Sequence, residues 1–158
     1  MSSIPIKITL LITLAVTLVF ASMAFAQGHV MQTSAKIQWG EAPPMVPPGS
    51  KMAVLSGNPK EDSLYTVRVK LPANYKIPAH SHPKDEHVTV LSGNLSMGMG
   101  DKLDLKGGKA LGVGGFAMMP ANINHFAYTT KETIIQLDGQ GPMDFKYVNP
   151  ADDPRNKK

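Results

Sequence analysis

Three side chains of the types that bind metal ions lie within seven residues of the sequence: His80, His82 and Glu86. Side chains two residues apart on a strand point to the same face, so the two histidines can reach one ion. We expect residues 83–85 to turn the chain and Glu86 to start the adjacent strand of a hairpin. The stretch therefore predicts a metal site built on two neighbouring strands.

A fourth candidate ligand, His125, lies in a later segment, where Pro120 ends one short strand and the histidine begins the next. Three imidazoles and one carboxylate suit Mn, Fe, Co, Ni, Cu or Zn. On an octahedral ion, four protein ligands leave two positions for water, substrate or dioxygen. The sequence contains no cysteine, so thiolate nucleophiles, disulfides and cysteine-based metal sites are excluded.

Other candidate residues have simpler interpretations. By strand alternation, His87 faces away from the preceding glutamate and is expected on the surface or in a second layer, and His29 lies near the start of the chain. Met97 and Met99 share a strand face, where core packing is favoured over copper binding. Gln136 either supports the site from inside a barrel or faces solvent, and the sequence leaves both readings open.

Short β-prone runs separated by turn residues must position these side chains. The 14 glycines and 13 prolines argue against an all-helical fold. Seven runs of this kind, at a spacing typical of a sandwich or barrel, cover residues 51–56, 63–71, 86–92, 95–99, 115–119, 132–138 and 144–148. Within the second run, apolar and polar residues alternate, so Tyr65, Val67, Val69 and Leu71 are expected to face the interior.

With these residues in place, the chain resembles the cupins. The first cupin motif is usually written G-x5-H-x-H-x(3,4)-E-x6-G, and His80, His82, Glu86 and Gly93 match its form with the shorter insert. Asn74 replaces the opening glycine. Because asparagine tolerates the left-handed conformation, this departure casts little doubt on the fold.

The second cupin motif is usually written G-x5-P-x-G-x2-H-x3-N. Gly114, Pro120 and His125 match it, whereas Asn122 replaces the inner glycine and Thr129 the final asparagine. The four metal-binding positions of the two motifs are therefore intact. The resemblance is closest to small exported cupins with a single domain.

The resemblance implies an all-β, RmlC-like cupin barrel (a double-stranded β-helix, or jelly roll) over residues 51–148. It also implies one divalent transition metal ion, bound by His80, His82, Glu86 and His125, and a homodimer. The prolines of residues 27–50 predict an extended arm, and residues 149–158 read as a polar C-terminal tail.

Residues 1–26 have the layout of a secretory signal peptide. Lys7 precedes an apolar run and the ending ASMAFA, which contains an A-x-A cleavage pattern before Gln27. We expect cleavage there, export to the periplasm or the medium, and no stable membrane anchor afterwards. An uncleaved anchor is the competing interpretation, although the apolar run is short for a span of about 20 residues.

The composition narrows the possible functions. With 158 residues and 16 basic against 12 acidic side chains, the chain carries a formal charge of +4, scattered rather than clustered, so nucleic acid is not an expected partner. The motifs favour an exported metal-binding cupin. It is either an Fe- or Mn-type oxygenase or related enzyme acting on a small organic substrate, or a non-enzymatic module that binds metal or a small ligand, in which the ion is mainly structural. The sequence identifies neither the metal nor a substrate.

Overall fold

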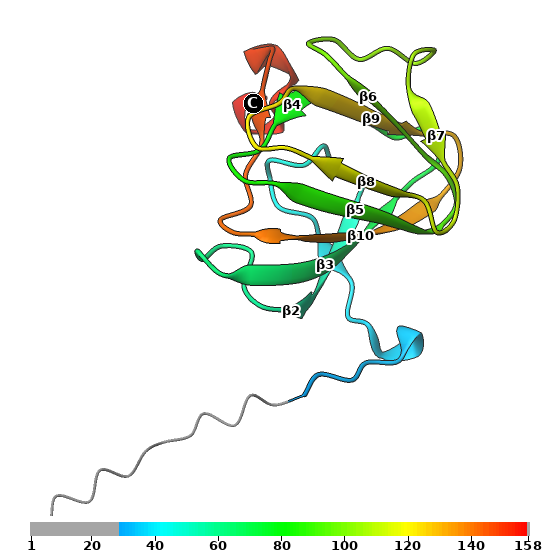
Figure 1. The fold of residues 1–158 in the computed structure, drawn as a ribbon, viewed down its shortest axis with the longest axis vertical. Helices are drawn as coiled ribbons and strands as arrows, with labels where there is room; N and C mark the ends of the chain where they lie inside the picture. The colour runs from blue at the N-terminus through cyan, green and yellow to red at the C-terminus, as the bar shows by residue number, and fades with distance from the viewer. Residues whose placement is uncertain (1–28, 158) are drawn as a thin grey trace, which may run out of the picture.

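The structure is a computed structural model in which residues 29–157 are described, and the predicted signal peptide at residues 1–26 lies outside them. Two antiparallel sheets form the body of the described part (Figure 1). The first sheet has six strands in the order β1 (Gly40–Glu41), β2 (Lys51–Ser56), β3 (Leu64–Leu71), β10 (Thr133–Gln140), β5 (Glu86–Ser92) and β8 (Phe116–Met119). The second has five, in the order β11 (Lys146–Tyr147), β4 (Lys76–Ser81), β9 (His125–Thr129), β6 (Leu95–Met99) and β7 (Lys109–Leu111).

The core fills the space between the inner faces of the two sheets. On β3 the predicted alternation is confirmed, because Tyr65, Val67, Val69 and Leu71 are buried while the residues between them are partly exposed. On the neighbouring β10, the same pattern turns Ile135 inward. Period-two patterning therefore sets which face of each strand enters the barrel.

One sequence expectation about strand pairing is wrong. Strands β4 and β5 were expected to form a hairpin, but β4 pairs with β9 and β11 in one sheet while β5 pairs with β10 and β8 in the other. Residues 83–85 therefore carry the chain from one sheet to the other. Strands β5 and β6, which the turn at Gly93 connects, also lie in different sheets. The short connection between two strands predicts a turn, but it does not predict which sheet the second strand joins.

The two asparagines that replace motif glycines adopt the left-handed conformation. Asn74 has φ 59° and Asn122 has φ 62°, and both lie in exposed turns. Asparagine visits this region more easily than other residues with a Cβ atom. The departures from the cupin motif therefore preserve the backbone that the motif requires.

The N-terminal arm runs from His29 to Ser50 in mostly extended form, with one short 3-10 turn, η1 (Ser34–Lys36). The Trp39 ring lies under the Lys70 ammonium group, 4.9 Å from ring centroid to Nζ. Further along, the Tyr147 hydroxyl donates a hydrogen bond to the Met45 carbonyl at 2.7 Å, and the Tyr75 hydroxyl donates one to the Pro47 carbonyl. The arm is therefore bound to the barrel at several points.

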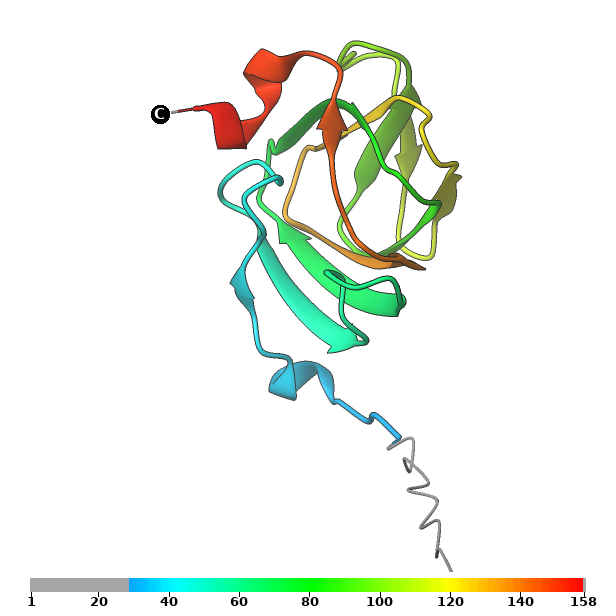
Figure 2. The ribbon, with the colours of Figure 1, turned by 90° about the vertical axis from the view of Figure 1, so that its left-hand side faces the viewer.

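The predicted polar tail forms two 3-10 helices, η2 (Pro150–Asp152) and η3 (Pro154–Asn156). The side chains of Asn149 and Asp153 cap them by accepting hydrogen bonds from Ala151 N and Arg155 N. Figure 2 shows this tail beside the loop of the arm before β2, and the two segments together line one surface cleft. Within residues 29–157, no helix has the length and apolar character needed to cross a membrane.

Candidate metal centre

Three histidines converge in the interior of the barrel from two adjacent strands. His80 on β4 and His125 on β9 are partners in the antiparallel register, and His82 comes directly after the end of β4. One ring nitrogen of each lies within 4.8 Å of the others. All three side chains are buried, with exposed fractions of 2, 1 and 6% for His80, His125 and His82.

Backbone carbonyls hold each imidazole through its Nδ1 atom. A carbonyl can only accept, so each of these hydrogen bonds requires the proton on Nδ1 and leaves the lone pair on Nε2. The bonds run from His80 Nδ1 to Pro78 O at 2.7 Å, from His82 Nδ1 to Asp144 O at 2.9 Å and from His125 Nδ1 to Ile123 O at 3.1 Å. The backbone thus sets the tautomer in which Nε2 can bind a metal ion.

Two observations show that these residues could hold a metal ion. The Nε2 atom of His82 is buried and has no hydrogen-bond partner, and leaving a buried polar atom unpaired costs about 1–3 kcal/mol. The Glu86 carboxylate, also buried, has its Oε2 atom 3.4 Å from this nitrogen. A cation bound between them would satisfy the nitrogen and balance the carboxylate charge.

Burial also keeps His80 and His125 in the form that binds metal. It lowers the pKa of His80 well below its ordinary value, and the nearby His125 and His82 lower it further. Burial lowers the pKa of His125 to about 4. For Glu86, burial raises the pKa, while the adjacent His82 opposes this rise. His80 and His125 are therefore neutral at neutral pH, as metal binding requires.

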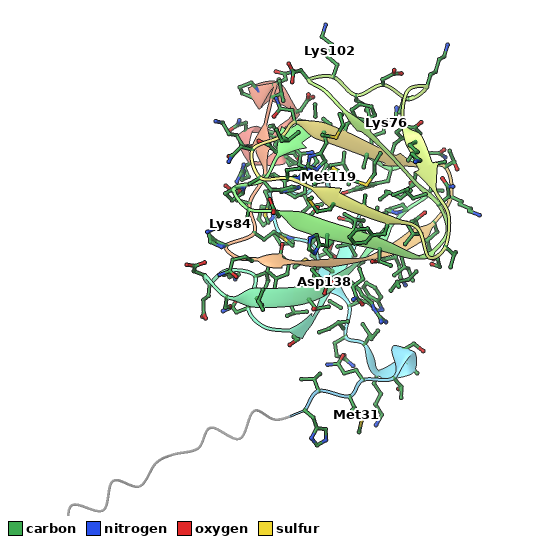
Figure 3. The ribbon with its side chains drawn as sticks, viewed as in Figure 1. Met31, Lys76, Lys84, Lys102, Met119 and Asp138 are labelled. Atoms are coloured by element: carbon green, nitrogen blue, oxygen red, sulfur yellow. The ribbon has the colours of Figure 1, made fainter. Side chains whose placement is uncertain are left out.

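A cavity of about 40 Å³ lies beside the candidate ligands. His80, Glu86 and His125 provide its polar surface, and the remaining lining side chains are apolar. They come from both sheets, from the arm and from the segment before β11: Ala42, Val46, Met52, Val69, Leu71, Ile77, Val88, Leu95, Met97, Ala127, Ile135, Leu137, Met143 and Phe145. No lysine or arginine of residues 29–157 lines this cavity; in Figure 3, Lys84 and Lys102 extend away from the barrel.

The structure brings three of the four sequence-predicted ligands into one cluster and places the fourth, Glu86, against one of them. His80, His82 and His125 form the cluster of converging nitrogens, and Glu86 contacts His82 from the opposite sheet. The ligand set therefore joins the two sheets instead of lying on a single hairpin.

The remaining candidates lie away from this cluster. His87 is exposed on the outer face, with its ring centroid 5.8 Å from that of Phe116, and His29 is exposed on the arm. Gln136 also faces outward, where it accepts a hydrogen bond from Arg68 Nε at 3.3 Å. Met97 is buried and lines the cavity, whereas Met99 is exposed, so the two methionines do not act together.

Two residues that support the cluster carried no signal in the sequence. The Phe145 ring stacks on the His80 ring, with centroids 4.1 Å apart and planes at 10°. The carbonyl of Asp144 holds His82, and any residue type could supply a carbonyl. The run 144–148 was recognisable as a strand, but its contact with the histidines depends on the tertiary fold.

Comparisons with known proteins agree with this architecture. A family model described as "Domain of unknown function (DUF4437)" matches residues 25–146. The polyketide cyclase RemF from Streptomyces resistomycificus has a TM-score of 0.64 at 16% identity, over 80% of this chain and 90% of that one. An RmlC-like cupin from Shewanella frigidimarina has a TM-score of 0.56 at 15% identity, over 72% and 91%.

A third solved structure, the DMSP lyase DddQ from Ruegeria pomeroyi, has a TM-score of 0.53 at 20% identity, over 73% of this chain and 68% of that one. At these identities the likeness concerns the fold, and it confirms the predicted cupin barrel. No curated protein matches the sequence.

Proposed function

This chain belongs to the family described as "Domain of unknown function (DUF4437)" and has the cupin fold, and from that premise we propose that it is a metal-dependent enzyme acting on a small, uncharged organic molecule. One observation carries the proposal: three buried histidines, each with Nε2 left free by a backbone hydrogen bond on Nδ1, form one cluster, and two of them, His80 and His125, line an apolar cavity. Histidines that serve only for packing do not need to share a tautomer, and their ring nitrogens do not need to converge.

The residues of the chain have distinct roles in this proposal. His80, His82 and His125 hold a divalent transition metal with Glu86, whose carboxylate reduces the net charge of the site. The bound ion supplies Lewis-acid chemistry and, where the metal is Fe or Mn, redox chemistry. The apolar walls exclude water, which strengthens electrostatic interactions inside the cavity. With no cationic side chain in the described lining, an uncharged substrate is favoured over a carboxylate or phosphate.

A second candidate function has its own support. Apart from the four candidate ligands, the described lining offers no acid, base or nucleophile. A module that binds metal or a small ligand without catalysis, with the ion mainly structural, would need no such group. Catalysis in the first proposal must therefore depend on the metal.

Dioxygen uptake tests the two candidates against each other. The protein would be loaded with Fe(II) or Mn(II), checked for metal content and mixed with a panel of small neutral organic compounds, with their carboxylate analogues as controls. Uptake with neutral compounds, lost in His80→Ala and retained in His87→Ala, supports an oxygenase. A fully loaded protein that consumes no dioxygen and converts no compound in the panel favours the binding module.

We further propose that the chain is exported to the periplasm or the medium after cleavage before Gln27, and that it forms a homodimer. Support comes from the apolar segment with its A-x-A ending and from the resemblance to exported cupins. Intact-mass measurement of the native protein tests the cleavage site. Light scattering tests the dimer, and a monomer at micromolar concentration would exclude a stable one.

A further inference from the structure

The segment Asp144–Phe145 contacts two of the three clustered histidines. Its first residue accepts the hydrogen bond from His82 Nδ1 on its carbonyl, and its second stacks on the ring of His80. The segment precedes β11, which pairs with β4 over only two residues. Two metal-ligand candidates therefore depend on a piece of chain with little sheet structure of its own.

Arg155 of the C-terminal tail binds this segment at two points. Its Nη1 atom donates to Asp144 Oδ1 at 2.9 Å, and its Nη2 atom donates to the Phe145 carbonyl at 2.8 Å. One planar guanidinium thus contacts both residues that hold the histidines. Because its donors are arranged in a rigid fork, arginine can bind two acceptors with defined geometry.

The guanidinium is itself held in place by Asp153. The Asp153 carboxylate accepts from Arg155 Nε at 2.9 and 3.1 Å and from Nη2 at 2.8 Å, and it also caps η3. The helix cap and the arginine clamp share this one carboxylate. The tail is therefore an ordered element next to the site.

We propose that Arg155 is a positioning residue of the metal centre: the C-terminal tail, through this side chain, orients the His82 and His80 rings by holding Asp144 and Phe145. The inference rests on the proposed metal-binding function. Groups that orient metal ligands from behind typically change metal affinity about 10- to 100-fold when they are removed. Arg155 acts on the histidine rings only through Asp144 and Phe145, so an effect near the lower limit, about tenfold, is expected for Arg155→Ala.

The test uses the full chain with the variants Arg155→Ala and Arg155→Lys and the control Arg68→Ala. Arg68 is matched because it also lies in hydrogen-bonding contact on the surface, with Gln136, but on the outer face of the other sheet. Metal affinity is measured by competition with a chelator of known affinity, using Co(II), whose visible spectrum reports ligand geometry. In parallel, NMR of the metal-free protein follows the Nδ1–H proton of His82.

The proposal expects about tenfold weaker Co(II) binding and an altered Co(II) spectrum in Arg155→Ala, partial recovery in Arg155→Lys and no change in Arg68→Ala. In the metal-free state, the His82 Nδ1–H signal should exchange faster with water in Arg155→Ala. Lower thermal stability of Arg155→Ala with unchanged affinity and spectrum would overturn the proposal, because it would reduce the tail to a structural clamp. If Arg155→Ala does not fold, wild-type affinity and spectrum in Arg155→Lys would overturn it equally.

Failure of this inference can be separated from failure of the proposed function. If the wild-type protein binds no metal, the proposed function is wrong, yet the His82 Nδ1–H signal still reports whether Arg155 orients the ring. If wild type and Arg155→Ala bind Co(II) equally, only the role of Arg155 is wrong.

Discussion

The Phe145 ring lies parallel to the His80 ring, 4.1 Å away between centroids. This contact covers the candidate ligand with an apolar surface and connects β4 to the segment that leads into the C-terminal tail. Phe145 also lines the cavity, so this side chain both packs against His80 and shapes the site.

Replacing Phe145 with leucine should lower the free energy of unfolding by about 1–3 kcal/mol, because the stacked ring pair is lost and a gap remains next to His80. Phe116→Leu is the matched control, since this phenylalanine is 58% exposed on β8, and it should change stability by less than about 0.5 kcal/mol. Urea unfolding measures both values. Equal effects of the two substitutions would contradict the role assigned to the stacked pair.

We expect metal-binding assays to distinguish the three candidate histidine ligands from His87, which lies outside the cluster. His80→Ala, His82→Ala and His125→Ala each remove one converging nitrogen and should bind metal at least about 100-fold more weakly. His87→Ala removes an exposed ring on the outer face and should bind normally. Metal stoichiometry and competition affinity at one near-neutral pH provide the measurement. Full metal content in His125→Ala together with loss in His87→Ala would show that the register of the site is wrong.

Glu86→Gln tests the charge of the fourth candidate ligand at constant size. The carboxylate is buried 3.4 Å from His82 Nε2, so its loss should weaken the binding of a divalent ion clearly. Because oxygen ligands matter more for harder ions, we expect a larger loss for Mn(II) or Fe(II) than for Cu(II). Affinities measured for the three metals on one preparation decide this, and an equal loss for all three would contradict it.

Removing the metal should lower the melting temperature. An ion that binds the folded chain at a free concentration 100 times its Kd stabilises it by about 2.7 kcal/mol. Calorimetry of the metal-loaded and the chelated protein measures the difference, with metal content verified in both. Identical midpoints would leave the ion without a role in stability.

The two left-handed asparagines give a prediction about the backbone. Asn74→Gly and Asn122→Gly should keep stability within about 0.5 kcal/mol of wild type, whereas the alanine variants should each lose about 1–2 kcal/mol, because alanine pays the full steric penalty of positive φ. Thermal or urea unfolding of the four variants tests this. Alanine variants as stable as the glycine variants would mean that the turns can change conformation.

Much of this architecture could be predicted from the sequence, for identifiable physical reasons. Strand alternation indicates which residues share a face, so it predicts that Tyr65 faces the interior and that His87 faces away from Glu86, on the surface or in a second layer. The motif spacing brought His125 into the ligand set. Alternation does not say which sheet a strand joins, so the β4–β5 hairpin was wrong. Asp144 contacts His82 through its backbone carbonyl, and Arg155 contacts Asp144 from the C-terminal tail. Local sequence patterns predict neither contact.

The crossing of the chain between sheets at residues 83–85 affects when the metal centre can form during folding. A ligand set on one hairpin would assemble locally and early, but this set joins β4 and β9 of one sheet to β5 of the other. Contacts between distant parts of a chain form late, because loop closure must precede them. The complete set of candidate ligands can therefore exist only after the barrel has closed, and a metal ion that uses all four would bind an already folded protein.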